Sequence, residues 1–428
     1  MKGPNFVVIY TDDHGYSDLG CCGSDDLKTP NLDGLAESGV RFTNWYSNSP
    51  VCSPSRASLL TGCYPQRVGV PHILGGIRGT PGLSPEHTTI ARLLKSAGYR
   101  SGVFGKWHLG TTIEHGPNAH GFDEYFGFRS GAMDYYSHIY YSAIGGGNNP
   151  NHDLWENENE VWENGRYLTE MFTDKGVDFI RCSDEPFFLY VPFNAPHWPL
   201  HAPKEYVDRF PDLPPDRRIM AAMLAAVDDG VGAIIDALNE KGVYDDTVIF
   251  FSSDNGPSDE SRNRLDGSKE SYYGGEKGIF KGYKASLFDG GIHEPAIISW
   301  PNGIPGGRVC DEVVAMMDVV PTFLDIAGIE PEAKCDGASI LPILTDNAPS
   351  PHDRIFWSYG DQLAVRQGRW KLVINGKLDF DRTQPDEVYL SDLDADPSEI
   401  TNLKDQYPEL VRELTSAIHE WMADVGIK

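Results

Sequence analysis

Two pairs of oxygen-bearing side chains follow short apolar runs. Asp12 and Asp13 come after "FVVIY", and Asp254 and Asn255 follow "TVIFFSS". Because ligands in an open α/β sheet bind beyond the carboxyl ends of its strands, we expect these side chains to meet there. Three carboxylates and an amide oxygen suit a hard cation, Ca²⁺ or Mg²⁺. Either pair alone is more typical of a turn than of a metal site, since Asp and Asn cap helices and tolerate turn conformations.

Four basic side chains follow other predicted strands or turns. Lys106 and His108 are two residues apart, so both can point to one side if the segment stays extended. His197 lies between two prolines, and Lys284 lies in "YKASLFDGGIHEP". Each residue alone also fits a structural role, as a surface lysine, a core histidine or a turn residue. Together they predict an anion pocket that faces the metal.

Cys52 and Arg56 lie in the stretch "PVCSPSRASLLTG". We expect a helix with its first turns at 55–60 and with Pro54 at its entrance, where the missing N–H costs nothing. Cys52 then lies near the positive helix end, where an anion is stabilised, and Arg56 stays charged. The pattern predicts a reactive centre at an anion site. It leaves open whether Cys52 is a thiol, a disulfide partner or a nucleophile.

The elements that must position these residues alternate along the chain. Strands are predicted at 6–10, 41–47, 99–105, 186–193, 247–253 and 295–300, and helices at 88–99, 168–182 and 218–242. Alternation of this kind predicts an α/β fold with a largely parallel central sheet. The long polar stretch 130–160, rich in Gly and Asn, is predicted to be an irregular insertion or a wall of the active site.

The character of the chain changes near residue 346. Short antiparallel strands with tight turns are predicted there, followed by an amphipathic helix at 407–426. We therefore expect two units, a catalytic domain at 1–345 and a smaller C-terminal α+β subdomain at 346–428.

The composition limits the partners. With 63 acidic against 36 basic residues, the 428-residue chain has a formal charge of −27, which disfavours nucleic acid and anionic membranes. No stretch approaches the ~20 apolar residues that span a bilayer. The start of the chain lacks the apolar segment of a signal peptide, so either the protein is cytoplasmic or the signal has been removed. Seven cysteines without a CxxC pair leave the redox compartment open.

The quoted motifs resemble those of the type I sulfatases, in the arylsulfatase/alkaline phosphatase superfamily. "CSPSR" with "ASLLTG" is similar to their first signature, and "GYRSGVFGKWHLG" to their second. "TDDHGYSDLG", "GFDEYFGF", "NAPHWP", "SSDNGP", "DGGIHEP" and "LSDLDADPSEITNL" follow in the family's order over nearly the whole chain. The resemblance implies an alkaline-phosphatase-like sandwich, with a large mostly parallel sheet flanked by helices and an antiparallel C-terminal sheet.

The resemblance also implies how the residues act. Cys52 would be oxidised to Cα-formylglycine by a formylglycine-generating enzyme, and its hydrate would attack the sulfur of a sulfate ester. The implied ligands of a divalent ion, usually Ca²⁺, are Asp12, Asp13, Asp254 and Asn255. Arg56 and Lys106 would hold the hydrate and His108 would be its base, while His197 and Lys284 grip the sulfate and assist the leaving group.

Two other functions stay open at this point. One is a phosphodiesterase or phosphonate monoester hydrolase that uses the same fold and nucleophile. The other is a sulfated-glycan-binding protein without activity, which would result if Cys52 were never oxidised.

The expected substrate is a carbohydrate sulfate, because "SGAMDYYSHIYY" resembles a stretch of arylsulfatase B-like enzymes. Tyr135, Tyr136 and His138 would contact the sugar, or else the loop packs against the domain. Further candidates for the substrate pocket are His72, Arg78 and His293, the last in a position where many family members have arginine. Because most family members are exported, the expected location is periplasmic or extracellular, and the initial Met leaves a cytoplasmic location open.

Overall fold

The computed structural model describes residues 3–140, 150–184, 186–260, 274–330, 335–379, 384 and 386–427. Within this part of the chain the strands are β1 (Asn5–Asp12), β2 (Val40–Phe42), β3 (Trp45–Tyr46), β4 (Arg100–Lys106), β5 (Glu124–Phe128), β6 (Ile139–Tyr140), β7 (Asn151–His152), β8 (Trp155–Glu156), β9 (Asn159–Glu160), β10 (Phe187–Pro196), β11 (Thr247–Ser253), β12 (Ala296–Ser299), β13 (Arg308–Cys310), β14 (Val314–Ala315), β15 (Ile355–Tyr359), β16 (Gln362–Gln367), β17 (Trp370–Ile374) and β18 (Val388–Asp392). The helices are α1 (Pro30–Ser38), α2 (Cys52–Thr61), α3 (Ile90–Ser96), α4 (Leu168–Cys182), α5 (Lys204–Val207), α6 (Pro215–Lys241), α7 (Asp289–Ile292), α8 (Val319–Ala327), α9 (Leu341–Asp346) and α10 (Pro408–Val425).

A large mixed sheet forms the centre of the molecule, in the order β13-β2-β12-β11-β1-β10-β4-β5-β8-β9. Its five middle strands, from β11 to β5, are all parallel. Strands β12 and β8, which flank them, are antiparallel to their neighbours. The fold class predicted from the sequence is therefore confirmed, including the mostly parallel sheet.

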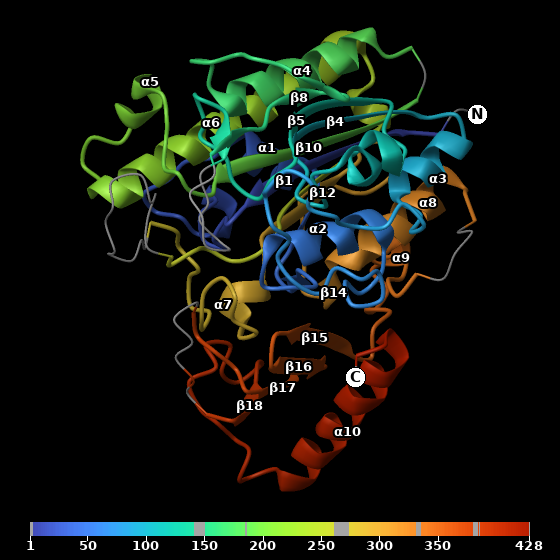
Figure 1. Cartoon of the computed structure of the whole chain (residues 1–428). Coiled ribbons are helices and arrows are strands. Elements are labelled where there is room, and N and C mark those ends of the chain that lie inside the picture. Colours follow the sequence, from blue (N-terminus) through green and yellow to red (C-terminus); the bar gives the residue numbers. More distant parts are fainter. Residues whose placement is uncertain are drawn as a thin grey trace.

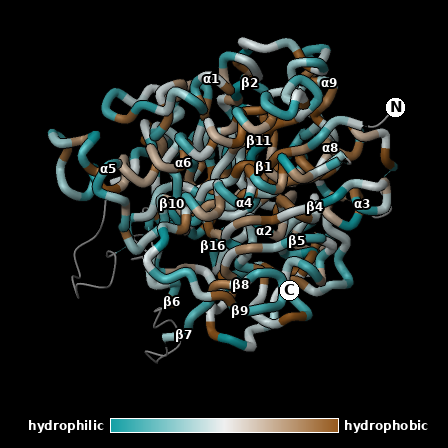
Figure 2. Tube along the Cα trace, turned by 90° about the horizontal axis from the view of Figure 1, so that it is seen from above, coloured by the Kyte–Doolittle hydropathy of each residue, from teal (hydrophilic) through white to brown (hydrophobic). Residues whose placement is uncertain are grey.

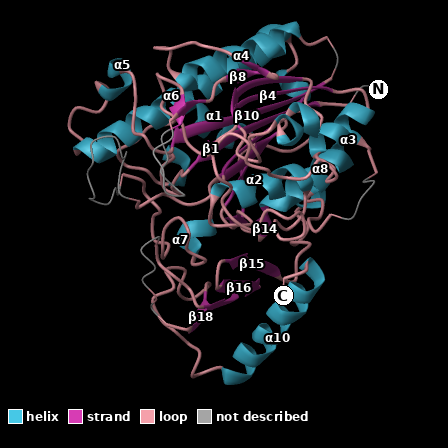
Figure 3. Cartoon of the chain, viewed as in Figure 1, coloured by secondary structure: helices cyan, strands magenta, loops and turns pink. Residues whose placement is uncertain are grey.

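Helices cover both faces of this sheet (Figures 1 and 3). Strand β1 shows why, because its residues alternate between two apolar clusters. Phe6 and Val8 pack with residues of α2, α3, α8 and α9. Val7 and Ile9 pack with residues of α1, α4 and α6 on the other face. Figure 2 shows hydrophobic residues gathered along the inner strands and hydrophilic residues on outlying segments such as α5. No helix among the described residues is long and apolar enough to cross a membrane.

One predicted strand is divided in the structure. The segment 41–47 forms β2 in the central sheet and then β3, which pairs with β14 instead. The change occurs at Thr43 and Asn44. The backbone N–H of Thr43 donates to the Cys310 carbonyl oxygen at the end of β13, and the side-chain amide of Asn44 donates to the Asp311 carbonyl oxygen before β3 begins. The predicted helices are present with small shifts at their ends; α6, for example, begins three residues earlier, at Pro215.

The C-terminal region forms a separate four-stranded antiparallel sheet, β15-β16-β17-β18, below the main body in Figure 1. One face packs on α10 through an apolar cluster that includes Val365 and Leu414. The other face packs on the main body through Trp357 and Tyr46. Buried Lys371 pairs with Asp289 across this contact. The α+β character of the region is thus present, whereas the boundary at 345/346 stays a prediction.

The predicted irregular insertion at 130–160 contains only two-residue strands among its described residues, β6 to β9. Residues 141–149 of this stretch lie outside the described part of the chain.

Candidate active site

The carboxyl ends of four parallel strands meet at one edge of the central sheet. Strands β11, β1, β10 and β4 are consecutive neighbours, and they end at Ser253, Asp12, Pro196 and Lys106. Asp12 lies opposite Pro196 in the ladder, and Thr11 lies opposite Ser253. Most of the acidic and basic groups singled out in the sequence therefore converge, because they lie at or just after these strand ends, whereas Cys52 and Arg56 come from α2 and Lys284 from the loop before α7.

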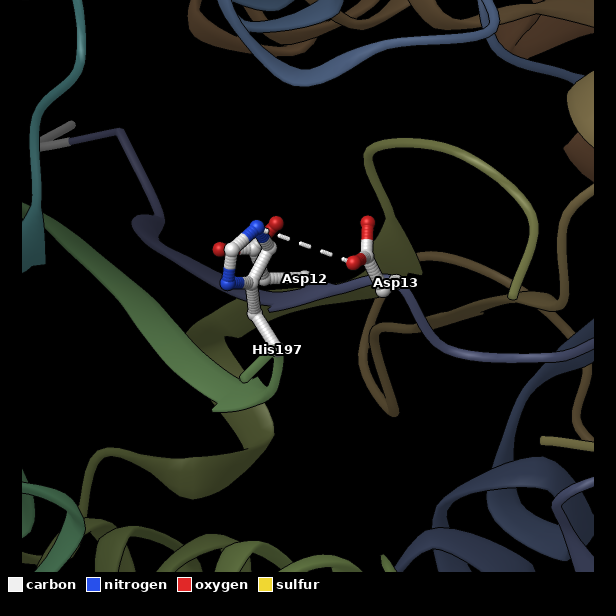
Figure 4. Close-up of side chains that lie close together, drawn as sticks. All are labelled: Asp12, Asp13 and His197. Carbon is white, nitrogen blue, oxygen red and sulfur yellow. Dashed lines mark ion pairs between the residues drawn. The ribbon is translucent and has the colours of Figure 1, made fainter. Parts of the chain in front are cut away.

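An oxygen-rich cluster joins the loops after β1 and β11. Asn255 Nδ2 donates to Asp13 Oδ1 at 2.7 Å, and the Asp13 backbone N–H donates to Asp254 Oδ1 at 3.3 Å. Asp13 has a φ of 64°, which turns the chain out of the strand. In Figure 4 the carboxyl groups of Asp12 and Asp13 lie close to the ring of His197. All five residues are buried, so the cluster is shielded from bulk water.

This cluster fits a hard divalent cation. Asp12 Oδ1 and Asn255 Oδ1 are buried and accept no hydrogen bond from any described residue, although buried polar atoms are normally satisfied. Burial raises the pKa of Asp13 to about 7 and that of Asp254 to about 6, against the lowering effect of nearby Lys and Arg charges. The cost of burying these carboxylates therefore exceeds what the neighbouring cations offset. Oxygen donors with unmet acceptor capacity are the ligands that Ca²⁺ and Mg²⁺ require.

Three buried cations surround these carboxylates. Lys106 Nζ donates to Asp12 Oδ2 at 2.5 Å, and Arg56 Nη2 donates to Asp254 Oδ2 at 2.8 Å. Lys284 Nζ lies 2.9 Å from Asp13 Oδ1. Burial opposes the charge of Lys284, but Asp13 raises its pKa well above the ordinary value, so this amine stays protonated. Arg56 is charged at any pH. The site therefore holds a fixed array of positive groups suited to an oxyanion.

Cys52 is the first residue of α2, so the helix begins three residues earlier than predicted. Val51 is extended and precedes the helix, and Pro54 lies within the first turn, where no N–H is needed. The ligand atoms of Asp12, Cys52 and Asp254 lie within 4.8 Å of one another, which places residue 52 against the oxygen cluster. Burial raises the pKa of the Cys52 thiol to about 11, against the effect of Lys106. As an unmodified thiol, it is a poor nucleophile at neutral pH.

The hydrogen bond of His108 fixes its tautomer. His108 Nε2 lies 3.0 Å from the carbonyl oxygen of Leu74. Because a carbonyl can only accept, Nε2 carries the proton and Nδ1 has the free lone pair. His108 Nδ1 is buried and has no partner among the described residues. Burial, with Lys106 adding to it, holds the pKa of His108 well below its usual range, so the ring is neutral. The ring can therefore accept a proton at Nδ1.

The segment from Lys106 to His108 does not stay extended. His108 has a φ of 55°, so the chain turns two residues after β4 ends. Both side chains nevertheless reach the site, because Lys106 points from the strand to Asp12 and His108 lines the pocket beside Cys52.

His197 is held in the opposite tautomer. Its Nδ1 donates to the carbonyl oxygen of Trp198 at 2.6 Å, which leaves Nε2 as the acceptor nitrogen. Nε2 lies 3.7 Å from Asp13 Oδ2. Burial and the Lys284 charge hold the pKa of His197 well below its usual range, so this ring is neutral as well.

These groups open into a small pocket of about 70 Å³. Its lining includes four predicted residues, Cys52, His108, His197 and Lys284. The remaining lining residues were not predicted: Ile73, Leu74, Gly76, Gly131, Ala132, Tyr140, Trp198 and Glu260. Three of them, Gly131, Ala132 and Tyr140, belong to the 130–160 stretch, which agrees with its expected role as a wall. Glu260 lies 3.5 Å from Lys284 Nζ, and nothing in the sequence marks it.

The structure places the aromatic candidates of that stretch outside the pocket. Tyr135 is fully buried, and its hydroxyl donates to the carbonyl oxygens of Asn194 and His197. Tyr136 packs on Tyr167, and His138 bonds to the backbone of Arg166. The alternative of a loop packed against the domain therefore describes Tyr135, whose ring is not available to a sugar.

The other three candidates also lie outside the pocket. Arg78 pairs with Glu160 and stacks near Trp155. His293 is buried, with its Nδ1 3.1 Å from Asp289 Oδ2, and it stacks on Phe280. His72 is exposed and lines a second cleft near Tyr359.

Comparisons with known proteins define the class of this fold and site. The sulfatase family profile matches residues 4–329, and a profile described as the C-terminal part of N-sulphoglucosamine sulphohydrolase matches residues 275–424. The chain is 31% identical to arylsulfatase J of Mus musculus, covering 98% of this chain and 75% of that protein. It is 33% identical to N-acetylgalactosamine-6-sulfatase of Rattus norvegicus, and the match covers 86% of this chain and 71% of that protein.

Solved structures agree. A crystal structure of Ps i-CgsB in complex with k-i-k-neocarrahexaose matches with a TM-score of 0.87 and 33% identity, over 98% of this chain and 93% of that one. A phosphonate monoester hydrolase of Agrobacterium radiobacter matches over 99% of this chain and 96% of its own, with a TM-score of 0.70 and 21% identity. This match shows a shared fold. The architecture is that of the alkaline-phosphatase-like superfamily. Within it, the chain belongs to the sulfatase family and is an enzyme of that class, as its motifs predicted.

Proposed function

We propose that this sulfatase hydrolyses a carbohydrate sulfate with a formylglycine made from Cys52 and a divalent cation, Ca²⁺ or Mg²⁺. The observation that carries the proposal is the position of residue 52. It lies at the start of α2, against the Asp12 and Asp254 carboxylates and in one pocket with His108 and Lys284.

Asp12, Asp13, Asp254 and Asn255 would hold the cation, which supplies positive charge next to the reacting oxygens. The hydrated aldehyde at residue 52 supplies two hydroxyl groups on one carbon, one to attack sulfur and one whose deprotonation releases sulfate.

The chain's own residues then supply charge and proton transfer. Arg56, Lys106 and Lys284 are positioned to offset the negative charge of the sulfuryl group. His108 accepts a proton at Nδ1, the nitrogen left free by its bond to Leu74. Of the two candidates for assisting the leaving group, Lys284 carries a proton at neutral pH, whereas His197 presents a bare Nε2. Lys284 is therefore the donor that we assign to the departing oxygen.

A carbohydrate substrate is supported by the relatives. Their names include N-acetylgalactosamine-6-sulfatase, and similar structures include a complex with k-i-k-neocarrahexaose. The pocket at Cys52 measures about 70 Å³, so it admits the sulfate group while most of a sugar ring lies beyond it.

A substrate panel tests the proposal. Protein produced together with a formylglycine-generating enzyme is assayed on sulfated monosaccharides, an aryl sulfate, a phosphate diester and a phosphonate ester, with Cys52→Ala as the control. We expect the highest kcat/KM on a sulfated sugar and no turnover by the variant. Faster hydrolysis of the phosphorus esters would favour the phosphohydrolase, and no turnover with an intact Cys52 thiol would favour the glycan-binding protein.

The proposal includes two further points: a formylglycine-generating enzyme matures Cys52, and the sulfatase is located outside the cytoplasm. Fractionation of the native cells tests the location, and an exclusively cytoplasmic protein would contradict it.

A further inference from the structure

Two cysteines that are far apart in the sequence meet at the C-terminal end of α2. Cys63 follows Gly62, the residue that caps this helix, and Cys335 lies in the segment between α8 and α9. Both are present as thiols, with Cys63 buried and Cys335 partly buried. Neither side chain belongs to the active site described above.

The two sulfur atoms share one hydrogen-bond acceptor. Cys63 Sγ lies 3.6 Å from the carbonyl oxygen of Thr61, and Cys335 Sγ lies 3.9 Å from the same oxygen. The Cys335 sulfur also lies against the backbone of Gly62, where an added Cβ would be 3.1 Å from it. Gly62 has a φ of 69°, so glycine suits this position both for its conformation and for the close approach of the sulfur. Both thiols therefore converge on one short stretch of backbone.

Backbone hydrogen bonds hold the two segments together. The Asp336 N–H donates to the Gly62 carbonyl oxygen at 2.9 Å. This bond joins the peptide unit just after Cys335 to the peptide unit just before Cys63. A second bond, from the Tyr64 N–H to Asp336 Oδ2, is also 2.9 Å long. Because opposed Cα atoms in bonded backbone pairs lie about 4.5–5.5 Å apart and disulfides span about 4.4–6.8 Å, this backbone contact suits a disulfide.

We propose that Cys63 and Cys335 form a disulfide that ties the C-terminal end of α2 to the segment after α8. The oxidant is a small disulfide such as oxidised glutathione. The thiolate of Cys335, the more exposed of the two, attacks this oxidant, forms a mixed disulfide and releases one small thiol. Cys63 then attacks the Cys335 sulfur, displaces the second small thiol and closes the bond. The two protein thiols lose two electrons and two protons, and the oxidant becomes two thiols.

The surroundings favour a stable bond over a labile one. Burial raises the pKa of the Cys63 thiol to about 11, and burial together with the Asp336 charge raises the pKa of Cys335. Thiols of high pKa are poor leaving groups, so a disulfide between them is reduced slowly. The same shift slows formation at neutral pH, since only the thiolate reacts. Such a bond persists in an oxidising compartment, which agrees with the location proposed above and does not depend on sulfatase activity.

Peptide mapping tests the bond directly. Purified protein is incubated with oxidised glutathione at mildly alkaline pH, denatured in iodoacetamide, and digested with trypsin without reduction. Each of the two cysteines lies in a tryptic peptide with no other cysteine, 57–67 and 335–354, so a linked peptide identifies the pair. We expect these peptides to be linked and to separate on reduction. Recovery of both with alkylated or glutathione-capped cysteines, or of either linked to another cysteine, would overturn the proposal.

A stability measurement shows what the bond contributes. The disulfide closes a long loop, so the oxidised protein should unfold roughly 5 °C above the reduced protein. Cys335→Ser should abolish this difference, and Cys63→Ala is the second variant if the first folds poorly. Cys182→Ser, at an exposed cysteine outside the pair, should retain it. A midpoint that does not respond to reduction, or a response that survives in both pair variants, would contradict the proposal. Neither measurement requires turnover, so failure here is distinguishable from failure of the proposed function.

Discussion

Asn255 and Asp13 are joined by a 2.7 Å hydrogen bond from the Asn255 amide nitrogen to Asp13 Oδ1. The same nitrogen also donates to the Gly256 carbonyl oxygen, so both amide hydrogens are used. The orientation of the amide is thereby fixed, and Asn255 Oδ1 is buried with no hydrogen-bond partner among the described residues. This relationship underlies the assignment of the cluster as a cation site.

We predict that Asn255→Ala weakens binding of the divalent cation at least tenfold, because it removes one of the proposed ligand oxygens and the amide that donates a hydrogen bond to Asp13. Calorimetric titration of metal-stripped protein with Ca²⁺ and with Mg²⁺ measures this. Asn239→Ala, at an exposed position on α6, should bind as the unaltered protein does.

Metal removal should also lower thermal stability, because the cation binds the folded state alone. At a concentration 100 times its Kd, the cation should stabilise the fold by about 2.7 kcal/mol. The midpoint of unfolding is compared with and without chelator, and identical midpoints together with unchanged activity would contradict a cation in this cluster.

His108→Ala should lower kcat by about 10²- to 10⁴-fold, since it removes the proposed base. The pH profile of kcat/KM provides a second readout. Burial holds the pKa of His108 below its usual range, so the acidic limb due to this group should lie below pH 6.5. His419→Ala, at an exposed position on α10, serves as the control. Unaltered kcat in His108→Ala would exclude this role.

In protein that has not been matured, Cys52 should resist alkylation. Burial raises the pKa of its thiol to about 11, so at pH 7.5 very little thiolate is present and access is poor. Iodoacetamide labelling followed by peptide mass spectrometry should show Cys182, which is exposed, modified well before Cys52. Faster labelling of Cys52 would indicate an open, activated thiol.

The ion pair of His352 predicts a pH dependence of stability. His352 Nε2 lies 2.8 Å from Asp318 Oδ1; burial opposes the charge, but the bond to Asp318 raises the pKa of the histidine above its usual value. Because the folded state binds the proton more tightly, the contribution to stability is fully present below the unfolded pKa of about 6.5 and is lost as the pH rises through the folded pKa.

The variant His352→Gln should therefore destabilise the protein more at pH 5.5 than at pH 9, by up to about 1.5–3 kcal/mol, the range for a hydrogen bond to a charged group. Denaturant unfolding at both pH values measures the difference. Equal destabilisation at the two values would show that this proton does not contribute.

The sequence was sufficient to predict which residues converge, because strand ends can be recognised from apolar runs. Asp12, Lys106, His197 and Asp254 each follow such a run, and parallel pairing then brings them to one edge of the sheet. The start of α2 was misplaced because Pro54 suggested the entrance of a helix, whereas the structure tolerates it within the first turn.

The walls of the pocket could not be predicted in the same way. Tyr135 and Tyr140 lie in one aromatic stretch, yet the first is buried against β10 and the second lines the pocket. Glu260 contacts Lys284 and Gln362 contacts Ala285, and the members of each pair are far apart in the sequence. No local sequence pattern signals such contacts. These positions depend on how loops and the C-terminal sheet pack, which composition and periodicity do not specify.

The central claim is that residue 52 works as a formylglycine within this site. Mass spectrometry of the tryptic peptide that contains residue 52, on protein of measured activity, tests it most directly. We predict an aldehyde in place of the thiol, at an occupancy that rises in proportion to sulfatase activity across preparations. Full sulfatase activity in a preparation whose Cys52 is entirely an unmodified thiol would contradict the account.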